Sequence, residues 1–261
     1  MTQPVAFDPQ TRPTPSLGGF NLTVLGIELR RMRRNRRTLF FTMAFPAALF
    51  LSFGAGANWN QDVGNGNVSA YIMVSMGLYG AALTTAAAGT QVALERSLGW
   101  SRQLRMPPLD PVAYIAMKAL LALVLGAFAV AVVNLVGLLQ GQPAMPVGVW
   151  IECALLTLAC SAVFAALGLF VGYLLPGENA MQVLGPGLAL LSFLGNVFIP
   201  IEEGTWIHAV AQLTPMYGVA EISRYPLTGD LTWSACLNAV VWLAVFVAGA
   251  AWRMSRDTAR V

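Results

Sequence analysis

A dense cluster of arginines stands directly before the first long apolar run of the chain. Six arginines fall between positions 30 and 37, and the next twenty residues, TLFFTMAFPAALFLSFGAGA, carry no charge. Each arginine near the middle of a bilayer costs about 2.5–3.5 kcal/mol, so six would resist translocation by up to about 15–20 kcal/mol. The cluster should therefore stay on the cytoplasmic side and direct the first helix outward. Its members are Arg30, Arg31, Arg33, Arg34, Arg36 and Arg37.

The composition excludes an ordinary soluble domain. Hydrophobic residues make up 57% of the 261 residues and charged residues only 10%, whereas soluble domains carry roughly 25% charged residues. The net charge of +3 does not indicate a nucleic-acid partner, because the basic residues lie at the edges of apolar runs, where they favour contact with membrane lipid. We expect a polytopic membrane protein.

Six apolar runs are each long enough to cross a bilayer, which takes about 20 residues. They are residues 38–57, 70–92, 112–139, 149–175, 180–199 and 232–252. Six crossings place both termini in the cytoplasm and the connections 58–69, 140–148 and 201–231 outside. With this topology, fourteen of the fifteen basic residues are cytoplasmic and only Arg224 is not, as the positive-inside rule requires.

The segments that flank the expected transmembrane domain (residues 38–252) are polar or amphipathic. Residues 1–17 contain four prolines and indicate a disordered cytoplasmic tail. Residues 18–37 have leucines at helical spacing among the arginines, which favours a basic amphipathic helix in the interfacial layer, although a solvated linker is the alternative. Residues 253–261 form a second cytoplasmic tail. The fold class is an all-α polytopic membrane protein.

The residue inventory also limits the chemistry. A P-loop needs Gly-Lys followed by Ser or Thr, and the single lysine, Lys118, lies in AMKAL. The chain is therefore not expected to bind a nucleotide by that route. The single histidine, His208, cannot form a metal cluster alone. Cys153 and Cys160 are seven residues apart on one expected helix, about 10 Å along its axis, which is too far for a disulfide.

Order and spacing of several motifs make the chain resemble the membrane (permease) subunit of type-2 ABC exporters. The resemblance runs from the entry NRRTLFFTMAFP, through the loop LERSLGWSRQLRMPPLDP and the turn PGENA, to FIPIE and LTPMYGVAEISRYPLTGD. It implies that two six-span subunits, identical or different, assemble with cytoplasmic ATPase subunits that bind ATP and Mg²⁺. It also implies a re-entrant outer segment before the last span. No cofactor is expected in this chain, which would not be an enzyme by itself.

The resemblance assigns the loop between the second and third spans to ATPase coupling. Its charged residues could form ion pairs and its apolar residues could anchor an interface, in which aromatic and arginine side chains often dominate. The alternative is that they mark a membrane boundary, with the tryptophan in the aromatic belt. The expected coupling residues are Glu95, Arg96, Leu98, Trp100, Arg102, Leu104 and Arg105.

The fifth span is expected to be broken by Gly185-Pro186-Gly187 and closed by Pro200, which together would act as a hinge, since proline removes a helix hydrogen bond. The resemblance places spans two and five around a central cavity, and the expected lining residues are Met76, Tyr79, Asn196 and Phe198. The alternative is that these side chains only pack. The expected cargo is amphipathic or hydrophobic: a drug, a lipid, a lipid-linked glycan or a peptide.

Other polar and small residues in the spans favour structural roles. Asn134, Asn196 and Asn238 are typical interhelical hydrogen-bond partners, and Glu152 in the first turn of a span favours a solvated helix-start acid. The pair Gly168-x-x-x-Gly172 permits close helix approach, although such pairs also arise by chance.

Two other function classes remain as alternatives. An ion-coupled secondary transporter would usually show a mid-membrane charge or inverted repeats with broken helices. An intramembrane enzyme would need paired carboxylates, a histidine with a serine, or metal ligands within the bilayer. The adjacent Glu202 and Glu203 are expected to be solvated instead.

Overall fold

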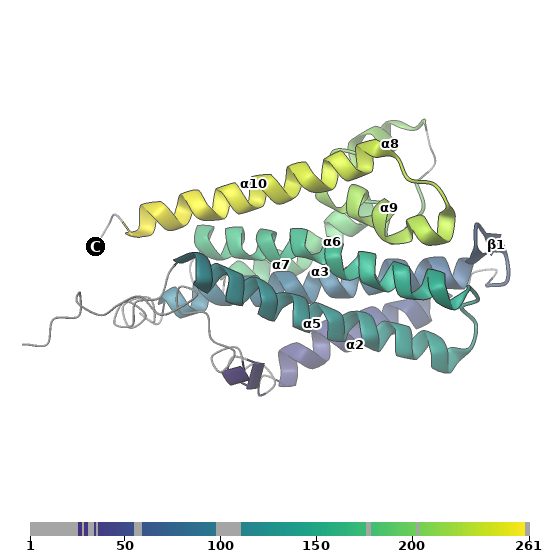
Figure 1. Cartoon of the computed structure of the whole chain (residues 1–261), viewed down its shortest axis with the longest axis horizontal. Helices are drawn as coiled ribbons and strands as arrows, with labels where there is room; N and C mark the ends of the chain where they lie inside the picture. The colour runs from purple at the N-terminus through teal and green to yellow at the C-terminus, as the bar shows by residue number, and fades with distance from the viewer. Residues whose placement is uncertain are drawn as a thin grey trace, which may run out of the picture.

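The computed structural model describes residues 36–54, 59–97, 111–175, 179–201 and 204–258, together with positions 26, 27, 29, 30 and 34. Within these ranges the chain is almost entirely helical, with one two-stranded antiparallel hairpin (Figure 1). The elements are α2 (Arg36–Gly54), β1 (Asp62–Val63), β2 (Gly66–Asn67), α3 (Val68–Ser97), α5 (Pro111–Gln140), α6 (Val147–Leu174), α7 (Asn179–Leu194), α8 (Trp206–Ala211), α9 (Pro215–Thr228) and α10 (Trp233–Thr258).

Helix α3 is the central helix of the bundle. It contacts α2, α5, α6, α7 and α9, and 89% of its most apolar window is buried, against 17% for α10. Its 30 residues span about 45 Å at 1.5 Å per residue. Many of these residues are Gly, Ala, Ser or Thr, which lets neighbouring helices approach closely. Helix α10, which lies at the edge of the bundle in Figure 1, presents most of its apolar surface outward.

Glycines make the contact between α3 and α6 very close. A Cβ added at Gly168 would lie 2.1 Å from the Ala86 carbonyl oxygen, and one added at Gly89 would lie 2.7 Å from the Leu169 nitrogen. Both obstacles are backbone atoms, which cannot rotate away as a side chain can. The close approach suggested by the Gly168–Gly172 pair is therefore present in the structure.

Four of the six expected spans correspond to helices that are long and apolar enough to cross a membrane. These are α3, α5, α6 and α10. The expected spans 38–57 and 180–199 correspond to the shorter helices α2 and α7. The 16 residues of α7 cover about 24 Å, less than the roughly 30 Å of a hydrocarbon core, so the count of six crossings stays a prediction.

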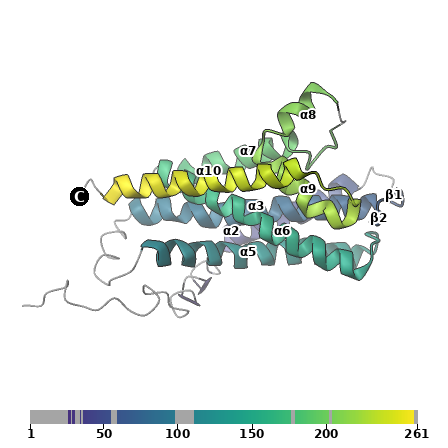
Figure 2. The same cartoon turned by 45° about the horizontal axis from the view of Figure 1, so that its top comes forward.

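The three connections expected outside meet at one end of the bundle. The Asn67 side-chain amide donates to the Gln142 carbonyl oxygen at 2.8 Å, and the Asn65 backbone nitrogen donates to the Leu227 carbonyl oxygen at 2.7 Å. The C-terminus lies at the opposite end (Figures 1 and 2). We call the end with β1 and β2 the hairpin end. The hairpin itself was not expected from the sequence. Helices α8 and α9 lie within residues 201–231, where a re-entrant outer segment was expected, and the entry of this segment into the membrane stays a prediction.

The expected N-terminal tail, residues 259–261 and most of the expected interfacial helix lie outside the described residues, although positions 26, 27, 29, 30 and 34 are helical. Residues 253–258, expected to belong to the C-terminal tail, continue α10 as helix.

Candidate functional site

Helix α7 ends at Leu194, five residues before the expected end of span five at Ile199. Asn196 follows with a φ of 61°, the left-handed conformation that commonly terminates helices. The Ser192 carbonyl oxygen then accepts from the backbone nitrogens of Val197 at 3.1 Å and Phe198 at 3.4 Å. The chain therefore leaves the helix well before Pro200, and the expectation that Pro200 closes it is wrong.

The expected break at Gly185-Pro186-Gly187 is also wrong, because α7 continues through Pro186 without interruption. A helix can absorb the single hydrogen bond that proline removes when its remaining turns are intact. A Cβ added at Gly185 or Gly187 would have no atom within 4 Å. These residues therefore border open space, and their role as a hinge stays a prediction.

Five aromatic side chains gather where α2, α3 and the end of α7 meet. The ring of Phe198 is 4.8 Å from Tyr79 and from Phe193, centroid to centroid, and 5.8 Å from Phe53. The ring of Phe45 is 6.3 Å from Tyr79. We call these five residues the aromatic cluster.

The aromatic cluster has one buried side and one open side. Tyr79 is only 2% exposed, whereas Phe45 and Phe193 are each 46% exposed. Such spacings suit edge-to-face and offset contacts between rings. The cluster can therefore offer a fixed apolar surface to a second copy, to lipid or to an apolar part of a cargo.

The structure brings two of the expected pathway residues together and separates the other two from the open side. Tyr79 and Phe198 are both in the aromatic cluster. Met76 is 1% exposed and packs in the core with Phe50. The side chain of Asn196 accepts a hydrogen bond from the Ile201 nitrogen at 3.0 Å, so it stabilises the turn after α7.

Arg224, on α9, is a buried cation, and in the sequence it stands out only as an exception to the charge pattern. Its side chain is 3% exposed. The Nη1 atom donates to the Tyr71 hydroxyl at 2.6 Å, to Ser75 Oγ at 3.3 Å and to the Asn196 carbonyl oxygen at 2.8 Å. The Nε atom donates to the Ala220 carbonyl oxygen at 3.1 Å.

These contacts make Arg224 the junction of three elements. Tyr71 and Ser75 belong to α3, Asn196 to the turn after α7, and Arg224 itself to α9. The guanidinium also lies over the Tyr71 ring, 4.5 Å from its centroid, a favourable cation–π geometry. The only advance signal was a lone basic residue away from the cytoplasmic side. Its partners on α3 are 149 and 153 positions away in the chain, so spacing alone could not reveal them.

Close packing holds the end of α7 against α9 beside this junction. A Cβ at Gly195 would lie 2.4 Å from the Cβ of Met216, and Met216 is fully buried. Gly195 is therefore needed for the approach of the two segments.

The other intramembrane polar residues have structural partners. Asn134 on α5 accepts a hydrogen bond from the Trp150 indole on α6, which confirms its interhelical role. Asn238 on α10 donates to the Gln212 carbonyl oxygen at 2.8 Å. Glu152 is exposed, in agreement with a solvated acid.

The expected coupling residues are not placed. Glu95 and Arg96 lie in the last turn of α3, but their side chains are outside what the structure describes. The remaining five, Leu98, Trp100, Arg102, Leu104 and Arg105, lie wholly outside the described residues.

Comparison with known proteins agrees with this architecture. The ABC-2 type transporter family matches residues 21–228. The chain is also 25% identical over 228 residues to a Bacillus subtilis (strain 168) protein named "Putative transport permease YvfS", covering 84% of this chain and 91% of that one. The family match covers well over half of the chain and includes α2 to α9. The chain belongs to the ABC-2 type transporter family, as a membrane permease subunit.

Proposed function

We propose that this chain is the permease of an ATP-driven exporter that spans the bacterial plasma membrane six times with both termini in the cytoplasm. It pairs with a second permease copy and with separate ATPase subunits, which bind ATP and Mg²⁺. The family match over residues 21–228 carries this proposal. Three connections lie together at one end of the bundle. This supports the topology, because six alternating crossings place the connections after the first, third and fifth spans on the same side of the membrane.

The central position of α3 supports the proposed coupling role. The expected coupling residues begin at Glu95, in the last turn of this helix. Because α3 is one continuous helix that is largely buried between Val68 and Leu94, a displacement of its end would be passed along the helix to Tyr79 and Tyr71. A docked ATPase would thereby influence both the aromatic cluster and the Arg224 junction.

The open side of the aromatic cluster supports an amphipathic or hydrophobic cargo, such as a drug, a lipid, a lipid-linked glycan or a peptide. Phe45, Phe53 and Phe193 present exposed rings there. Rings held in fixed contacts offer apolar surface with little loss of side-chain entropy on binding.

Reversing the charge of Arg102 and Arg105 tests the proposal. We expect the double change Arg102→Glu and Arg105→Glu to lower transport-coupled ATP hydrolysis by the reconstituted complex while membrane insertion stays intact. Arg256→Glu is the matched control, because Arg256 is an exposed arginine near the end of α10 and is not one of the expected coupling residues. ATP hydrolysis by the purified chain alone, or unchanged coupling in the double variant, would refute the proposal.

An ion-coupled secondary transporter is the second candidate, and the buried Arg224 favours it, because Arg224 bonds to Tyr71 and Ser75 of α3, and cations that contact a membrane span often belong to ion or proton pathways. Transport by the chain in vesicles with an ion gradient and no ATPase subunit would establish this candidate over the first.

A further inference from the structure

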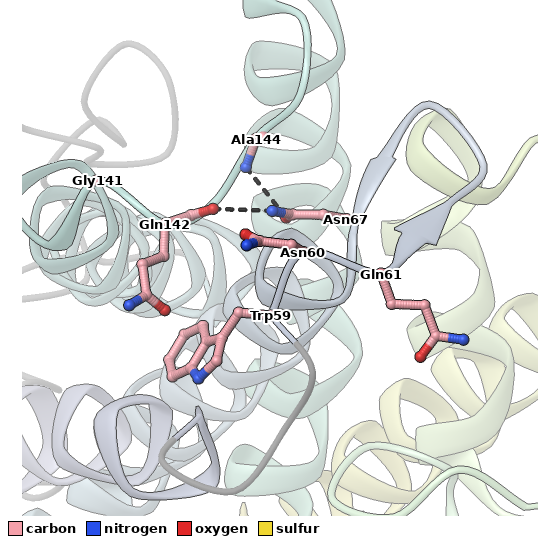
Figure 3. A pocket seen from close by; sticks show the side chains of 7 residues that line it. All are labelled: Trp59, Asn60, Gln61, Asn67, Gly141, Gln142 and Ala144. Atoms are coloured by element: carbon pink, nitrogen blue, oxygen red, sulfur yellow. Dashed lines mark hydrogen bonds between the residues drawn. The ribbon is translucent and has the colours of Figure 1, made fainter.

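A pocket of about 950 Å³ opens at the hairpin end of the bundle. Ligand pockets typically measure roughly 300–1,000 Å³, so it is large enough for a ligand of several rings. It lies between the segment before β1 and the connection from α5 to α6 (Figure 3). Its lining residues are Trp59, Asn60, Gln61, Asn67, Gly141, Gln142 and Ala144.

Asn67 fixes the wall of this pocket. Its side chain is 5% exposed, donates to the Gln142 carbonyl oxygen at 2.8 Å and accepts from the backbone nitrogens of Ala144 at 3.0 Å and Ala70 at 2.9 Å. Gly66 brings the hairpin against the same connection, because a Cβ there would lie 2.6 Å from the Ala144 carbonyl oxygen. The frame is thus formed before any ligand arrives, which lowers the entropic cost of binding.

The other amides of the pocket are available to a ligand. Asn60, Gln61 and Gln142 are exposed, and their side chains form no hydrogen bond with the residues that the structure describes. In Figure 3, Asn60 and Gln142 extend on the side of the pocket where Trp59 lies, whereas Gln61 points the opposite way. A carboxamide both donates and accepts, as a hydroxyl group does, so neighbouring amides match a ligand that is rich in hydroxyl groups.

Trp59 adds an apolar platform to these amides. Its indole is half-buried, and an edge-to-face contact with Phe50, at 6.1 Å and 80°, holds its orientation. An indole offers a large apolar face together with a polar edge. Sugars have the complementary character, because one face of the ring carries C–H groups while the hydroxyl groups project around its rim.

The absence of charge in the lining of the pocket favours neutral sugars over acidic ones. None of its seven lining residues is charged, so an anionic ligand would lose hydration without gaining a cationic partner. A smaller adjoining hollow of about 450 Å³ shares Asn60, Asn67 and Ala144 and includes Asp62, which repels anions further. The two hollows together give an uncharged oligosaccharide room to extend.

We propose that the hairpin end of this permease binds uncharged oligosaccharides, with Trp59 stacking on a sugar ring and Asn60 and Gln142 bonding its hydroxyl groups. The ligand is either a glycan part of the cargo on its way out or a neutral glycan of the cell envelope. Both sources share this chemistry.

A broad array of neutral and acidic glycans, probed with the purified permease in a detergent without a sugar headgroup, tests the proposal. We expect binding to neutral glycans, and binding about tenfold weaker for Trp59→Ala, the change that a loss of roughly 1.4 kcal/mol produces. Gln142→Ala should weaken binding too without unfolding the protein, because Gln142 is exposed and supports the frame only through its backbone carbonyl group. Trp206→Ala, at a tryptophan that is 76% exposed on α8, is the control and should bind normally.

Failure to bind any neutral glycan, equal binding of acidic glycans, or unchanged binding by the Trp59 and Gln142 variants would overturn the proposal. The assay uses the permease alone, so its failure is distinct from a failure of ATPase coupling. If the array identifies a ligand, its addition to the reconstituted complex separates the two sources. A glycan that belongs to the cargo stimulates ATP hydrolysis, and an envelope glycan binds without stimulation.

Discussion

Replacing Tyr71 with phenylalanine removes one hydrogen bond from the Arg224 junction and leaves the rest of it in place. The lost bond joins the Tyr71 hydroxyl to Nη1 of a guanidinium that is only 3% exposed. Hydrogen bonds to charged groups contribute about 1.5–3 kcal/mol. The ring that lies under the guanidinium is kept. We therefore expect Tyr71→Phe to lower the free energy of unfolding by about 1.5–3 kcal/mol.

The prediction becomes specific to the bond with Arg224 when Tyr71→Phe is also measured in a protein that carries Arg224→Met. It removes the charge and all four of the bonds described above, but it also removes the cost of burying a cation. Without the cation, the Tyr71 hydroxyl has lost its charged partner, so Tyr71→Phe should cost less than about 0.5 kcal/mol in that background. The difference between the two backgrounds is the coupling energy, which for residues in contact is typically about 0.5–3 kcal/mol.

Equilibrium unfolding of purified protein in mixed micelles, followed by circular dichroism, gives these free energies. Tyr225→Phe is the control, since Tyr225 is 42% exposed and lies next to Arg224 in the sequence, and its substitution should change little. Equal costs of Tyr71→Phe with and without Arg224, or a cost below about 0.5 kcal/mol in the native background, would refute the junction.

Three further predictions test the packing, the pathway and the topology. Gly168→Ala should destabilise the protein by about 1–3 kcal/mol through overpacking against α3, whereas Gly148→Ala on the same helix, with no atom within 4 Å, should be neutral or stabilising in thermal unfolding. Phe198→Ala should alter substrate preference or basal ATPase stimulation per folded complex more than Phe246→Ala, which changes a buried ring on α10; an equal or larger effect at Phe246 would place the pathway elsewhere. In intact cells, an impermeant maleimide should label a single cysteine at Asn65 and not one at Ser101, and the reverse pattern would invert the topology.

The sequence predicted those helices whose bounds depend mainly on one requirement, namely that an apolar run long enough to cross the membrane lies between polar connections. Expected spans 112–139 and 149–175 agree with α5 and α6 to within two residues at each end, because polar or proline-containing connections bound long apolar runs. It also predicted which connections share an end, because the distribution of arginine is governed by the cost of translocation.

The sequence could not predict features that depend on distant neighbours. Helix α7 ends at Leu194 because Asn196 adopts a left-handed conformation and Gly195 approaches Met216, which is 21 positions away in the chain. Residues 197–199, Val-Phe-Ile, are again apolar, so their hydropathy predicts a span that continues to Ile199. The predicted break at Pro186 is wrong for a related reason. Proline weakens a helix locally, and the surrounding turns decide whether the helix breaks.

These contacts indicate which part of the hairpin end can move. Helix α9 is fixed to the hairpin, because the Leu227 and Pro226 carbonyl oxygens accept from the backbone and side chain of Asn65. Among the residues that the structure describes, the end of α7 is tied to α9 by one charge-assisted hydrogen bond, from Arg224 to the Asn196 carbonyl oxygen, besides apolar packing. Breaking that bond costs about 1.5–3 kcal/mol, which corresponds to a factor of roughly 10–150 in a closed-to-open equilibrium. In the proposed exporter, the end of α7 would therefore be the gate. The hydrogen bond from Arg224 would keep it closed at rest, and a small displacement of α3 would be enough to open it.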